Sequence, residues 1–283
     1  MSGIIWLASY PKSGNTWLRA FLANYLSDSP EAVPINALPT FIYGDSHIPH
    51  YEQLAGQPLE GLSEEELAVL RGRVHLWLAR AKPHEVFVKT HSAMGRVGGA
   101  PAITPGATAG AIYVIRNPCD VAVSFAHHYQ VPVSRAVALL CDDDNMLPAS
   151  GGQLAQFLSS WRRHVLGWTE AKGLTLHLMR YEDMLRAPEA TFGKLVAFLG
   201  FPTQPERLRK ALAYSSFREL SGQERSGGFV EARPDGKSAF FRAGESGQHR
   251  HILADADRQH LIEANRDVLS KYGYLDDEGA LVF

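Results

Sequence analysis

The 283-residue sequence has few cysteines, no long apolar run and no excess of basic charge. Its two cysteines, Cys119 and Cys141, are too few for a disulfide framework, as is typical of a protein from a reducing compartment. No apolar segment reaches the roughly 20 residues that cross a bilayer. The N-terminus also lacks the basic start and small-residue cleavage site of a secretory signal. We therefore expect a cytoplasmic protein with no membrane partner.

The charge balance limits the possible partners. Lysine and arginine number 28 and aspartate and glutamate 30, so the formal net charge is -2. Binding to a long nucleic acid usually requires a basic excess, because contacts with the phosphate backbone dominate the affinity. The composition therefore argues against a long nucleic acid, whereas a local basic cluster can still bind a small anion.

The sequence also lacks the spacing of a metal site. Clustered carboxylates can hold hard cations, but the acidic run CDDDN (141–145) has no EF-hand spacing and no terminal glutamate. The cysteines form neither a Cys-x-x-Cys pair nor a zinc-type pattern. We interpret the acidic run as a solvated loop and expect no bound metal.

Four apolar runs are interpreted as strands, at residues 4–9, 85–91, 110–118 and 174–184. Helical patterns separate these runs, and no linker or internal repeat divides the chain. The alternation predicts one α/β domain over residues 1–283, with a parallel sheet flanked by helices. In such sheets ligands bind beyond the carboxyl ends of the strands, where this chain places its notable polar residues.

Apolar residues at helical spacing predict a helix from Trp17 onwards and another, the clearest in the chain, over residues 153–172. An Asp-rich start and a glycine stop predict a terminal helix over residues 254–273. Residues 26–61 and 221–250 show no periodicity. Because long loops in a compact domain are usually functional, we expect these two segments to border a binding site.

The turn after the first strand, YPKSGNTW (10–17), has the composition of an anion-binding loop. Backbone N–H groups at a tight turn and at a helix N-terminus favour a phosphate. Lys12 adds a positive charge, and Ser13 and Thr16 add hydroxyl donors. Taken alone, the hexapeptide PKSGNT is as compatible with an ordinary turn carrying a solvated lysine.

This turn differs from the P-loop G-x-x-x-x-G-K-[ST], because its lysine precedes the glycine. A P-loop enzyme would also need an acidic residue at a strand end to support Mg²⁺. The strand at residues 110–118 runs instead into Arg116, which would repel a metal ion and attract a second phosphate.

Three motifs together resemble those of the cytosolic-type sulfotransferases. YPKSGNTW (10–17) resembles the family's phosphosulfate-binding loop, and RNPCDVAVSFAHH (116–128) resembles its segment for a nucleotide 3′-phosphate. FFRAGESGQHR (240–250) resembles the late Arg-x-Gly loop, while KTH (89–91) and RYEDM (180–184) occur in the expected order. The resemblance covers essentially the whole chain and extends to bacterial small-molecule and natural-product sulfotransferases. It implies a P-loop-like three-layer α/β sandwich with a central parallel sheet.

The same resemblance implies 3′-phosphoadenosine-5′-phosphosulfate (PAPS) as sulfuryl donor and 3′-phosphoadenosine-5′-phosphate (PAP) as product. Lys12 would stabilise the leaving phosphate, and the amide of Asn15, where many members have threonine, would still donate. Trp17 would stack on adenine, although packing of the first helix also accounts for it. The residues implied for the donor site are Lys12, Ser13, Gly14, Asn15, Thr16, Trp17, Arg116, Ser124, Tyr181, Ser215, Phe217, Arg242 and Gly244.

For catalysis, the resemblance implies His91 as the general base and Lys89 as a partner of the sulfuryl group. An imidazole near its ordinary pKa can take a proton from a hydroxyl at neutral pH. His47, His50 and His249 are expected to be exposed loop histidines rather than residues of the acceptor pocket.

The expected activity is therefore sulfuryl transfer from PAPS to a hydroxyl or amine of a small molecule. One alternative is a P-loop-like small-molecule kinase, which should show the Gly-Lys pair and the Mg²⁺ carboxylate. Another is a non-catalytic nucleotide-binding protein, against which the catalytic residues argue. The acceptor should be selected by residues 26–61, 94–105, 129–150 and 221–250, and its identity stays open, as does the oligomeric state.

Overall fold

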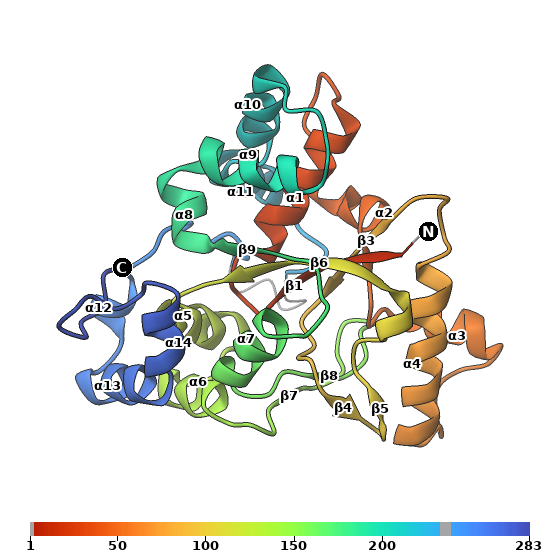
Figure 1. Ribbon diagram of the computed structural model, residues 1–283, viewed down its shortest axis with the longest axis horizontal. Helices are drawn as coiled ribbons and strands as arrows, with labels where there is room; N and C mark the ends of the chain where they lie inside the picture. Colours follow the sequence, from red (N-terminus) through yellow and green to blue (C-terminus); the bar gives the residue numbers. More distant parts are fainter. Residues whose placement is uncertain (1–2, 233–238) are drawn as a thin grey trace.

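The computed structural model describes residues 3–232 and 239–283. Its centre is a five-stranded parallel sheet in the order β2-β3-β1-β6-β9 (Figure 1). The four predicted strands are all present, and the short edge strand β2 was not predicted. The strands are β1 (Ile4–Ser9), β2 (Tyr43–Gly44), β3 (Val86–Thr90), β6 (Thr108–Ile115) and β9 (Leu176–Arg180).

The central strands are apolar on both faces, because each face is covered by helices. Alternate residues of β1 enter different cores: Trp6 packs with the first cluster of buried side chains and Leu7 with the second. Trp6 and Leu7 are both fully buried. This two-sided burial is typical of parallel sheets and explains why these strands appear in the sequence as continuous apolar runs.

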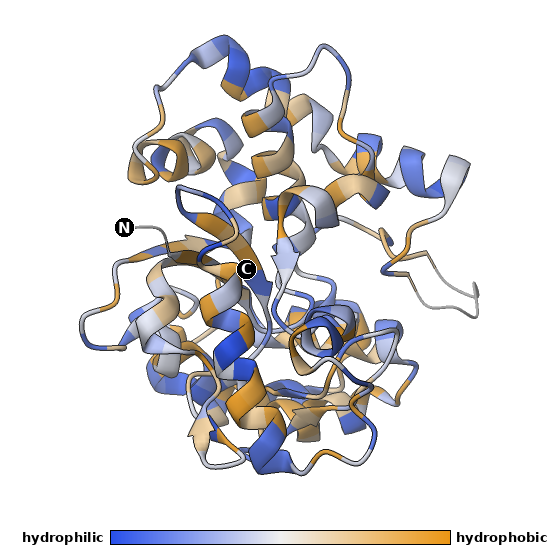
Figure 2. Ribbon diagram, turned by 90° about the vertical axis from the view of Figure 1, so that its right-hand side faces the viewer, coloured by the Kyte–Doolittle hydropathy of each residue, from blue (hydrophilic) through white to orange (hydrophobic). Residues whose placement is uncertain are grey.

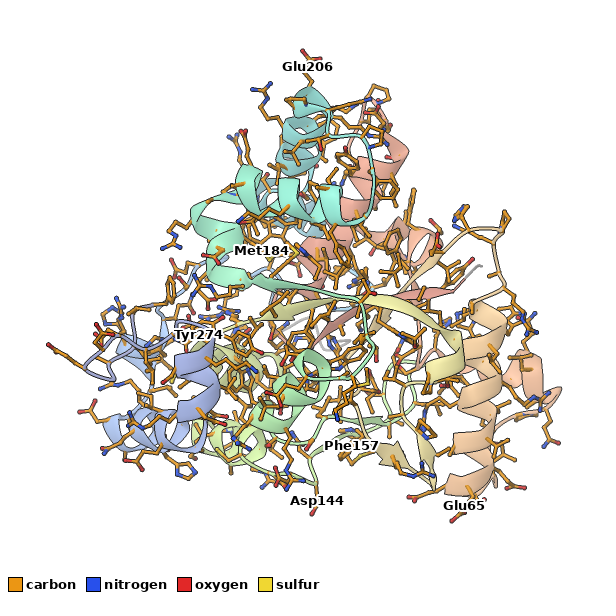
Figure 3. The ribbon with its side chains drawn as sticks, in the orientation of Figure 1. Glu65, Asp144, Phe157, Met184, Glu206 and Tyr274 are labelled. Atoms are coloured by element: carbon orange, nitrogen blue, oxygen red, sulfur yellow. The ribbon has the colours of Figure 1, made fainter. Side chains whose placement is uncertain are left out.

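Helices form the two outer layers, above and below the sheet in Figures 1 and 2. One layer contains α1 (Asn15–Ser27), α8 (Tyr181–Arg186), α9 (Pro188–Phe198) and α10 (Pro205–Tyr214), and the other is built mainly from α4, α5, α6, α7, α13 and α14. Figure 3 shows Met184 in the first layer and Tyr274 in the second. The other elements are η1 (Ile35–Ala37), α2 (Leu38–Phe41), α3 (Ile48–Ala55), α4 (Glu64–Leu78), β4 (Arg96–Val97), β5 (Ala100–Pro101), η2 (Pro105–Ala107), α5 (Pro118–Tyr129), α6 (Val133–Leu140), β7 (Met146–Leu147), β8 (Gln156–Phe157), α7 (Trp161–Thr169), α11 (Phe217–Gly227), α12 (His249–Ile252), α13 (Asp255–Ala264) and α14 (Arg266–Lys271).

The predicted helix over residues 153–172 is wrong in its first half. Residues 156–157 form β8, which pairs antiparallel with β7, and the helix α7 begins only at Trp161. Ser160 ends the extended segment, because its hydroxyl accepts the backbone N–H of Arg163 at 3.3 Å. Such local side-chain bonds compete with helix formation, and the Ser-Ser pair in this segment therefore marks a helix start rather than a helix interior.

The terminal helix predicted over residues 254–273 is divided into α13 and α14 at Asn265. The φ of Asn265 is −123°, which lies outside the helical region, and the side-chain amide of Asn265 donates to the carbonyl of Leu261 at 2.7 Å. Elsewhere, Asn117 caps α5 as its Asn-Pro sequence indicates, accepting the N–H of Cys119 at 2.9 Å. No helix in the described part of the chain is long and apolar enough to cross a membrane.

Candidate active site

The turn between β1 and α1 has two residues with left-handed backbone. Lys12 has φ 68° and Gly14 has φ 103°. A side chain is excluded at Gly14, since a Cβ there would lie 2.6 Å from the ring of Tyr181. Lys12 is not glycine, so its left-handed conformation costs energy of a kind that is concentrated at functional sites. The turn directs the free N–H groups of the α1 N-terminus towards the carboxyl ends of the strands.

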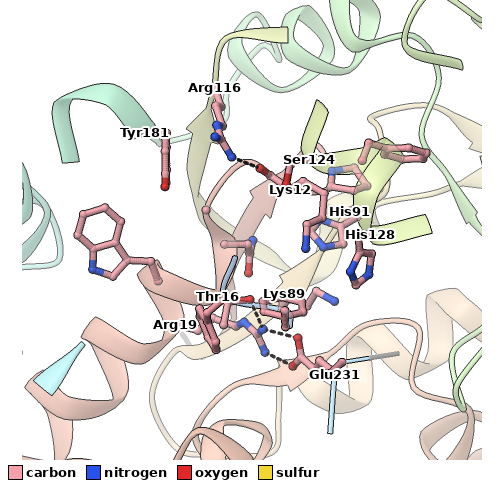
Figure 4. Close-up of a pocket in the computed structure, with 18 of the residues that line it drawn as sticks. Lys12, Thr16, Arg19, Lys89, His91, Arg116, Ser124, His128, Tyr181 and Glu231 are labelled. Atoms are coloured by element: carbon pink, nitrogen blue, oxygen red, sulfur yellow. Dashed lines mark hydrogen bonds and ion pairs between the residues drawn. The ribbon is translucent and has the colours of Figure 1, made fainter. Parts of the chain in front are cut away.

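A cavity of about 1380 Å³ opens at these strand ends (Figure 4). Ser13 is the one predicted site residue that does not line it, since that side chain is fully buried beneath the turn. The predicted residues that line it are Lys12, Gly14, Asn15, Thr16, Trp17, Lys89, His91, Arg116, Ser124, Tyr181, Ser215, Phe217, Arg242 and Gly244.

Several buried polar atoms around the turn have no hydrogen-bond partner in the described part of the chain. They are the hydroxyl of Ser13, the carbonyl oxygen of the Asn15 side chain, the indole N–H of Trp17 and the Nε–H groups of Arg19 and Arg116. Leaving such an atom unpaired costs roughly 1–3 kcal/mol. Four of these atoms are donors, and the Asn15 oxygen is an acceptor. The donors of Trp17, Arg19 and Arg116 belong to residues that line the cavity, where an anionic ligand would accept from them.

Lys12 is the charged centre of the turn. Burial, with a smaller contribution from the nearby positive charge of Arg116, lowers the pKa of its amine to about 7. The Nζ atom lies 3.9 Å from the centre of the Phe240 ring. Among the described residues no carboxylate forms an ion pair with Lys12, so the amine is poised to gain a full positive charge when an anion enters the cavity.

Arg116 joins three parts of the site. Its guanidinium donates to the carbonyl of Lys12 at 3.0 Å and to the carbonyl of Glu245 at 3.0 Å. It also stacks over the ring of Tyr181, with Cζ 4.3 Å from the ring centre. The arginine thus fixes the anion-binding turn, the late loop and the end of β9 relative to one another, and its Nε–H remains available for an anion.

The expectation that the Asn15 amide donates to the anion is wrong. Its Nδ2 donates to the carbonyl of Leu7 at 2.9 Å and to the hydroxyl of Ser9 at 3.3 Å, so both amide hydrogens bind β1. The side chain therefore holds the turn against its own strand. The hydroxyl oxygen of Thr16 accepts a hydrogen bond from Arg19 at 3.1 Å, so this bond does not use the hydroxyl proton, which can be donated to a ligand.

His91 directly follows β3, and its tautomer leaves one ring nitrogen unprotonated. Its Nδ1 lies 2.8 Å from the carbonyl oxygen of Ser9. A carbonyl can only accept, so Nδ1 carries the proton and Nε2 keeps a free lone pair. Burial, with a smaller contribution from Lys89, holds the pKa of His91 well below its usual value. The ring is therefore neutral at neutral pH, with one nitrogen able to take a proton.

The sequence analysis missed an ion pair inside the cavity, between Arg19 and Glu231. Two guanidinium nitrogens of Arg19 bind the two carboxylate oxygens at 2.6 Å each (Figure 4). Burial alone would raise the pKa of Glu231, but Arg19 and Lys89 lower it to about 2. The one available sequence signal was Arg19 itself, the single charged residue of α1, three positions after Thr16.

The late loop is fastened to α5 through Asp120. One carboxylate oxygen accepts the N–H of Gly247 at 2.6 Å, and the other accepts the N–H and Nδ1 of His249, both at 3.1 Å. His249 is 1% exposed, so the expectation of an exposed loop histidine is wrong. A Cβ at Gly244 would lie 2.3 Å from the Phe217 ring, which shows how closely the loop packs there.

The other end of the cavity is lined by histidines and by apolar and aromatic side chains. His47 and His50 both line it, with ring centres 5.0 Å apart, contrary to the expectation that they lie in exposed loops. Residues 94–105 form the β4–β5 hairpin against α4 and do not line the cavity, which also corrects the sequence analysis. The apolar and aromatic residues of this end are Pro39, Ile42, Tyr43, Phe125, Tyr129, Val131, Leu139, Met146, Leu147 and Pro148.

Comparison with known proteins gives similarity along nearly the whole chain. A family model described as a sulfotransferase domain matches residues 3–273. Sulfotransferase 1A1 of the dog, Canis lupus familiaris, is 27% identical over 261 residues, which cover 89% of this chain and 79% of that protein. Flavonol 3-sulfotransferase of Flaveria bidentis is 26% identical over 266 residues, covering 89% and 77% of the two chains.

Solved structures agree on the fold. Mouse sulfotransferase SULT7A1 complexed with PAP matches with a TM-score of 0.57 and 23% identity, over 96% of this chain and 88% of that one. Retinol dehydratase in complex with androsterone and PAP matches with a TM-score of 0.64 and 19% identity, over 94% and 80%. These likenesses confirm the predicted P-loop-like α/β fold with its central parallel sheet.

The Arg19–Glu231 pair gives a prediction on stability. We expect Glu231→Ala to lower the free energy of unfolding by about 3 kcal/mol, because it leaves the Arg19 guanidinium buried without a counter-charge. Since the pKa of Glu231 is depressed, the stabilisation is present above the ordinary pKa of a glutamate and is lost as the pH falls towards about 2. Urea unfolding measures the difference.

Glu170→Ala is the matched control, since it removes an exposed partner of Lys271 in a pair whose side chains are 55% and 46% exposed. We expect this control to cost less than about 1 kcal/mol. Equal, small effects of the two substitutions would show that the cavity pair does not stabilise the fold.

Proposed function

The chain belongs to the sulfotransferase domain family, and from this we propose that it transfers a sulfuryl group from PAPS to a hydroxyl or amine of a small-molecule acceptor, releasing PAP. Residues 1–283 would form one catalytic domain. The observation that carries the proposal is that two groups of residues suited to binding anions line one cavity. One is the turn at residues 12–16, and the other is Arg116 with Ser124 at the end of β6 and on α5.

Two separate subsites suit a nucleotide that is charged at both its 5′ and 3′ positions. The N–H groups of the turn and the Thr16 hydroxyl would hold the 5′-phosphate, and Arg116 with Ser124 would hold the 3′-phosphate. Trp17 and Tyr181, whose rings meet edge to face at 6.0 Å, would border the adenine. The unpaired Nε–H of Arg116 supports this fit, as do the PAP complexes among the structural neighbours.

PAPS, when bound, supplies the sulfuryl group, and the protein's own side chains move the proton and stabilise the charge. His91 would take the acceptor's proton at Nε2 while the acceptor oxygen forms its bond to sulfur. As the bond between sulfur and the bridging oxygen breaks, Lys12 would neutralise the charge that develops on the leaving phosphate. Lys89 would stabilise the sulfuryl oxygens; burial lowers the pKa of its amine, and the negative charge of Glu231 partly offsets that lowering.

We assign no divalent metal to this reaction. A P-loop kinase needs a carboxylate at a strand end to support Mg²⁺, and here the corresponding strand ends in Arg116. The charge that a metal carries in a kinase would be carried by Lys12 and the N–H groups of the turn. The acceptor would have an apolar body, because the far end of the cavity is lined largely by aromatic and aliphatic side chains.

We expect His91→Ala to reduce turnover by about 10²–10⁴-fold while PAP binding is retained, because the ring faces the acceptor and supplies general base catalysis. Transfer of sulfur-35 from labelled PAPS is measured first for a panel of phenols, alcohols and amines, in the presence of EDTA. The best hydroxyl acceptor is then used for the variant. Near-wild-type turnover of His91→Ala would exclude His91 as the base, and activity that requires added Mg²⁺ would contradict the metal-free assignment.

The second subsite predicts that the 3′-phosphate makes its own contribution to the binding affinity. Adenosine 5′-phosphosulfate, which lacks that group, should bind at least about tenfold more weakly than PAPS, since bidentate arginine contacts are among the strong ones. Arg116→Ala should remove most of this preference. Arg135→Ala, which changes an arginine lining the same cavity from α6, should leave it unchanged. Calorimetric titration gives the affinities, and equal wild-type affinity for both nucleotides would refute the second subsite.

The pKa of Lys12 predicts that nucleotide binding takes up a proton. With a pKa of about 7, the amine is mostly neutral at pH 8 in the free protein. A bound phosphate favours the charged form and raises that pKa, so about one proton should be absorbed per PAP. Affinity should consequently weaken as the pH rises above 7. Calorimetry at pH 8 in buffers of different ionisation enthalpy measures the uptake, and the same uptake in Lys12→Met would assign it to another group.

A further inference from the structure

The main chain around His91 is held by side chains that the mechanism does not use. Thr90 accepts the N–H of Ser92 at 3.0 Å, bridging over His91, and donates its own proton to the Asp45 carboxylate at 2.6 Å. The carbonyl of Ser92 accepts the indole N–H of Trp168 at 3.0 Å. The backbone on both sides of the base is therefore tied to neighbouring elements.

The carbonyl of His91 itself is bound by a second histidine, His164 of α7. Its Nε2 lies 2.9 Å from the His91 oxygen, and since a carbonyl only accepts, this nitrogen carries the proton. Its other nitrogen, Nδ1, lies 2.8 Å from the hydroxyl of Tyr113 on β6, which must donate. A directed chain of hydrogen bonds thus runs from Tyr113 through His164 to the backbone of His91.

His164 is fully buried and does not line the cavity, so it cannot touch a substrate directly. Burial lowers its pKa to about 4, so it stays neutral at physiological pH. The groups that surround it are the ring of Tyr10, whose centre is 5.3 Å away, the Tyr113 hydroxyl and the His91 carbonyl. In its neutral form it has one donor and one acceptor, and both are used.

We propose that His164 is a positioning residue for the reaction, and that Tyr113 selects the tautomer in which His164 can donate to the His91 carbonyl. His91 is then held at two ends, its ring by the carbonyl of Ser9 and its main chain by His164. These two anchors fix the direction of the Nε2 lone pair. The inference rests on the proposed role of His91 as the base.

Misplacement of a catalytic group by about 1 Å can cost roughly 10²-fold in rate. We therefore expect His164→Ala to lower kcat by about 10–100-fold, with the Kd for PAP changed less than about threefold. His164→Gln keeps an N–H donor at nearly the same reach and should recover kcat to within about fivefold of the wild type. Tyr113→Phe removes the donor to Nδ1 and should lower kcat by an intermediate factor.

His75→Gln is the matched control, because His75 is also a fully buried histidine bound through Nδ1 to a hydroxyl, that of Thr104 at 2.9 Å. It does not line the cavity, and its loss tests what burial of a histidine contributes to stability alone. Equal loss of kcat in His164→Ala and His75→Gln would overturn the proposal, as would failure of His164→Gln to recover activity.

A second measurement does not depend on the acceptor. Long-range ¹H–¹⁵N spectra of the histidine rings should show His91 protonated at Nδ1 alone in the wild type and in His75→Gln. In His164→Ala the spectra should show mixed tautomers at His91. If His164→Ala does not fold, Tyr113→Phe is measured in its place, with the same expected result. An unchanged His91 signal would overturn the proposal even if kcat falls.

The activities of the wild type, His91→Ala and His164→Ala distinguish a failure of this inference from a failure of the proposed function. A wild type that transfers no label from PAPS to 4-nitrophenol or to any acceptor of the panel, or a fully active His91→Ala, would refute the proposed function. Loss of activity in His91→Ala combined with a fully active His164→Ala would leave the function intact and refute the positioning role alone.

Discussion

The left-handed turn at Lys12 and Gly14 is the constraint on which the rest of the site depends. It allows β1 to pass into α1 within five residues, so that the N-terminus of the helix faces the strand ends. The turn is possible only because Gly14 has no side chain where the Tyr181 ring packs. Arg116 then stacks on Tyr181 and binds the carbonyl of Lys12. Three neighbouring strands are thereby locked together at the point where an anion would bind.

The cavity gathers more positive than negative charge, and its side chains are arranged accordingly. Burial, together with the positive charge of Arg116, lowers the pKa of Lys12. Arg19 is paired with Glu231, which lies 212 residues away in the chain. A site with unpaired donors and a partly neutral lysine is less stable empty than when it holds an anion. This difference in free energy is what would drive nucleotide binding, and it links affinity to pH.

Much of the fold followed from short-range patterns. The four main strands and the glycine turn between the first strand and the first helix were predicted, because buried parallel strands and glycine turns have strong local signals. The start of α7 and the break at Asn265 were missed, since side-chain hydrogen bonds override helical periodicity there. Residues that act through distant partners could not be predicted at all. Glu231 binds Arg19 and His249 binds Asp120, and only the folded chain brings these pairs together.

One nucleotide would span the two anion subsites, and a crystal structure of the protein with PAP tests this most directly. We expect the 5′-phosphate to lie within hydrogen-bond distance of the backbone N–H groups of residues 13–16. We further expect the 3′-phosphate to contact Arg116 and Ser124, with the Nε2 of His91 facing the open end of the cavity. A nucleotide bound with both phosphates at one subsite, or with Arg116 contacting neither phosphate, would contradict this expectation.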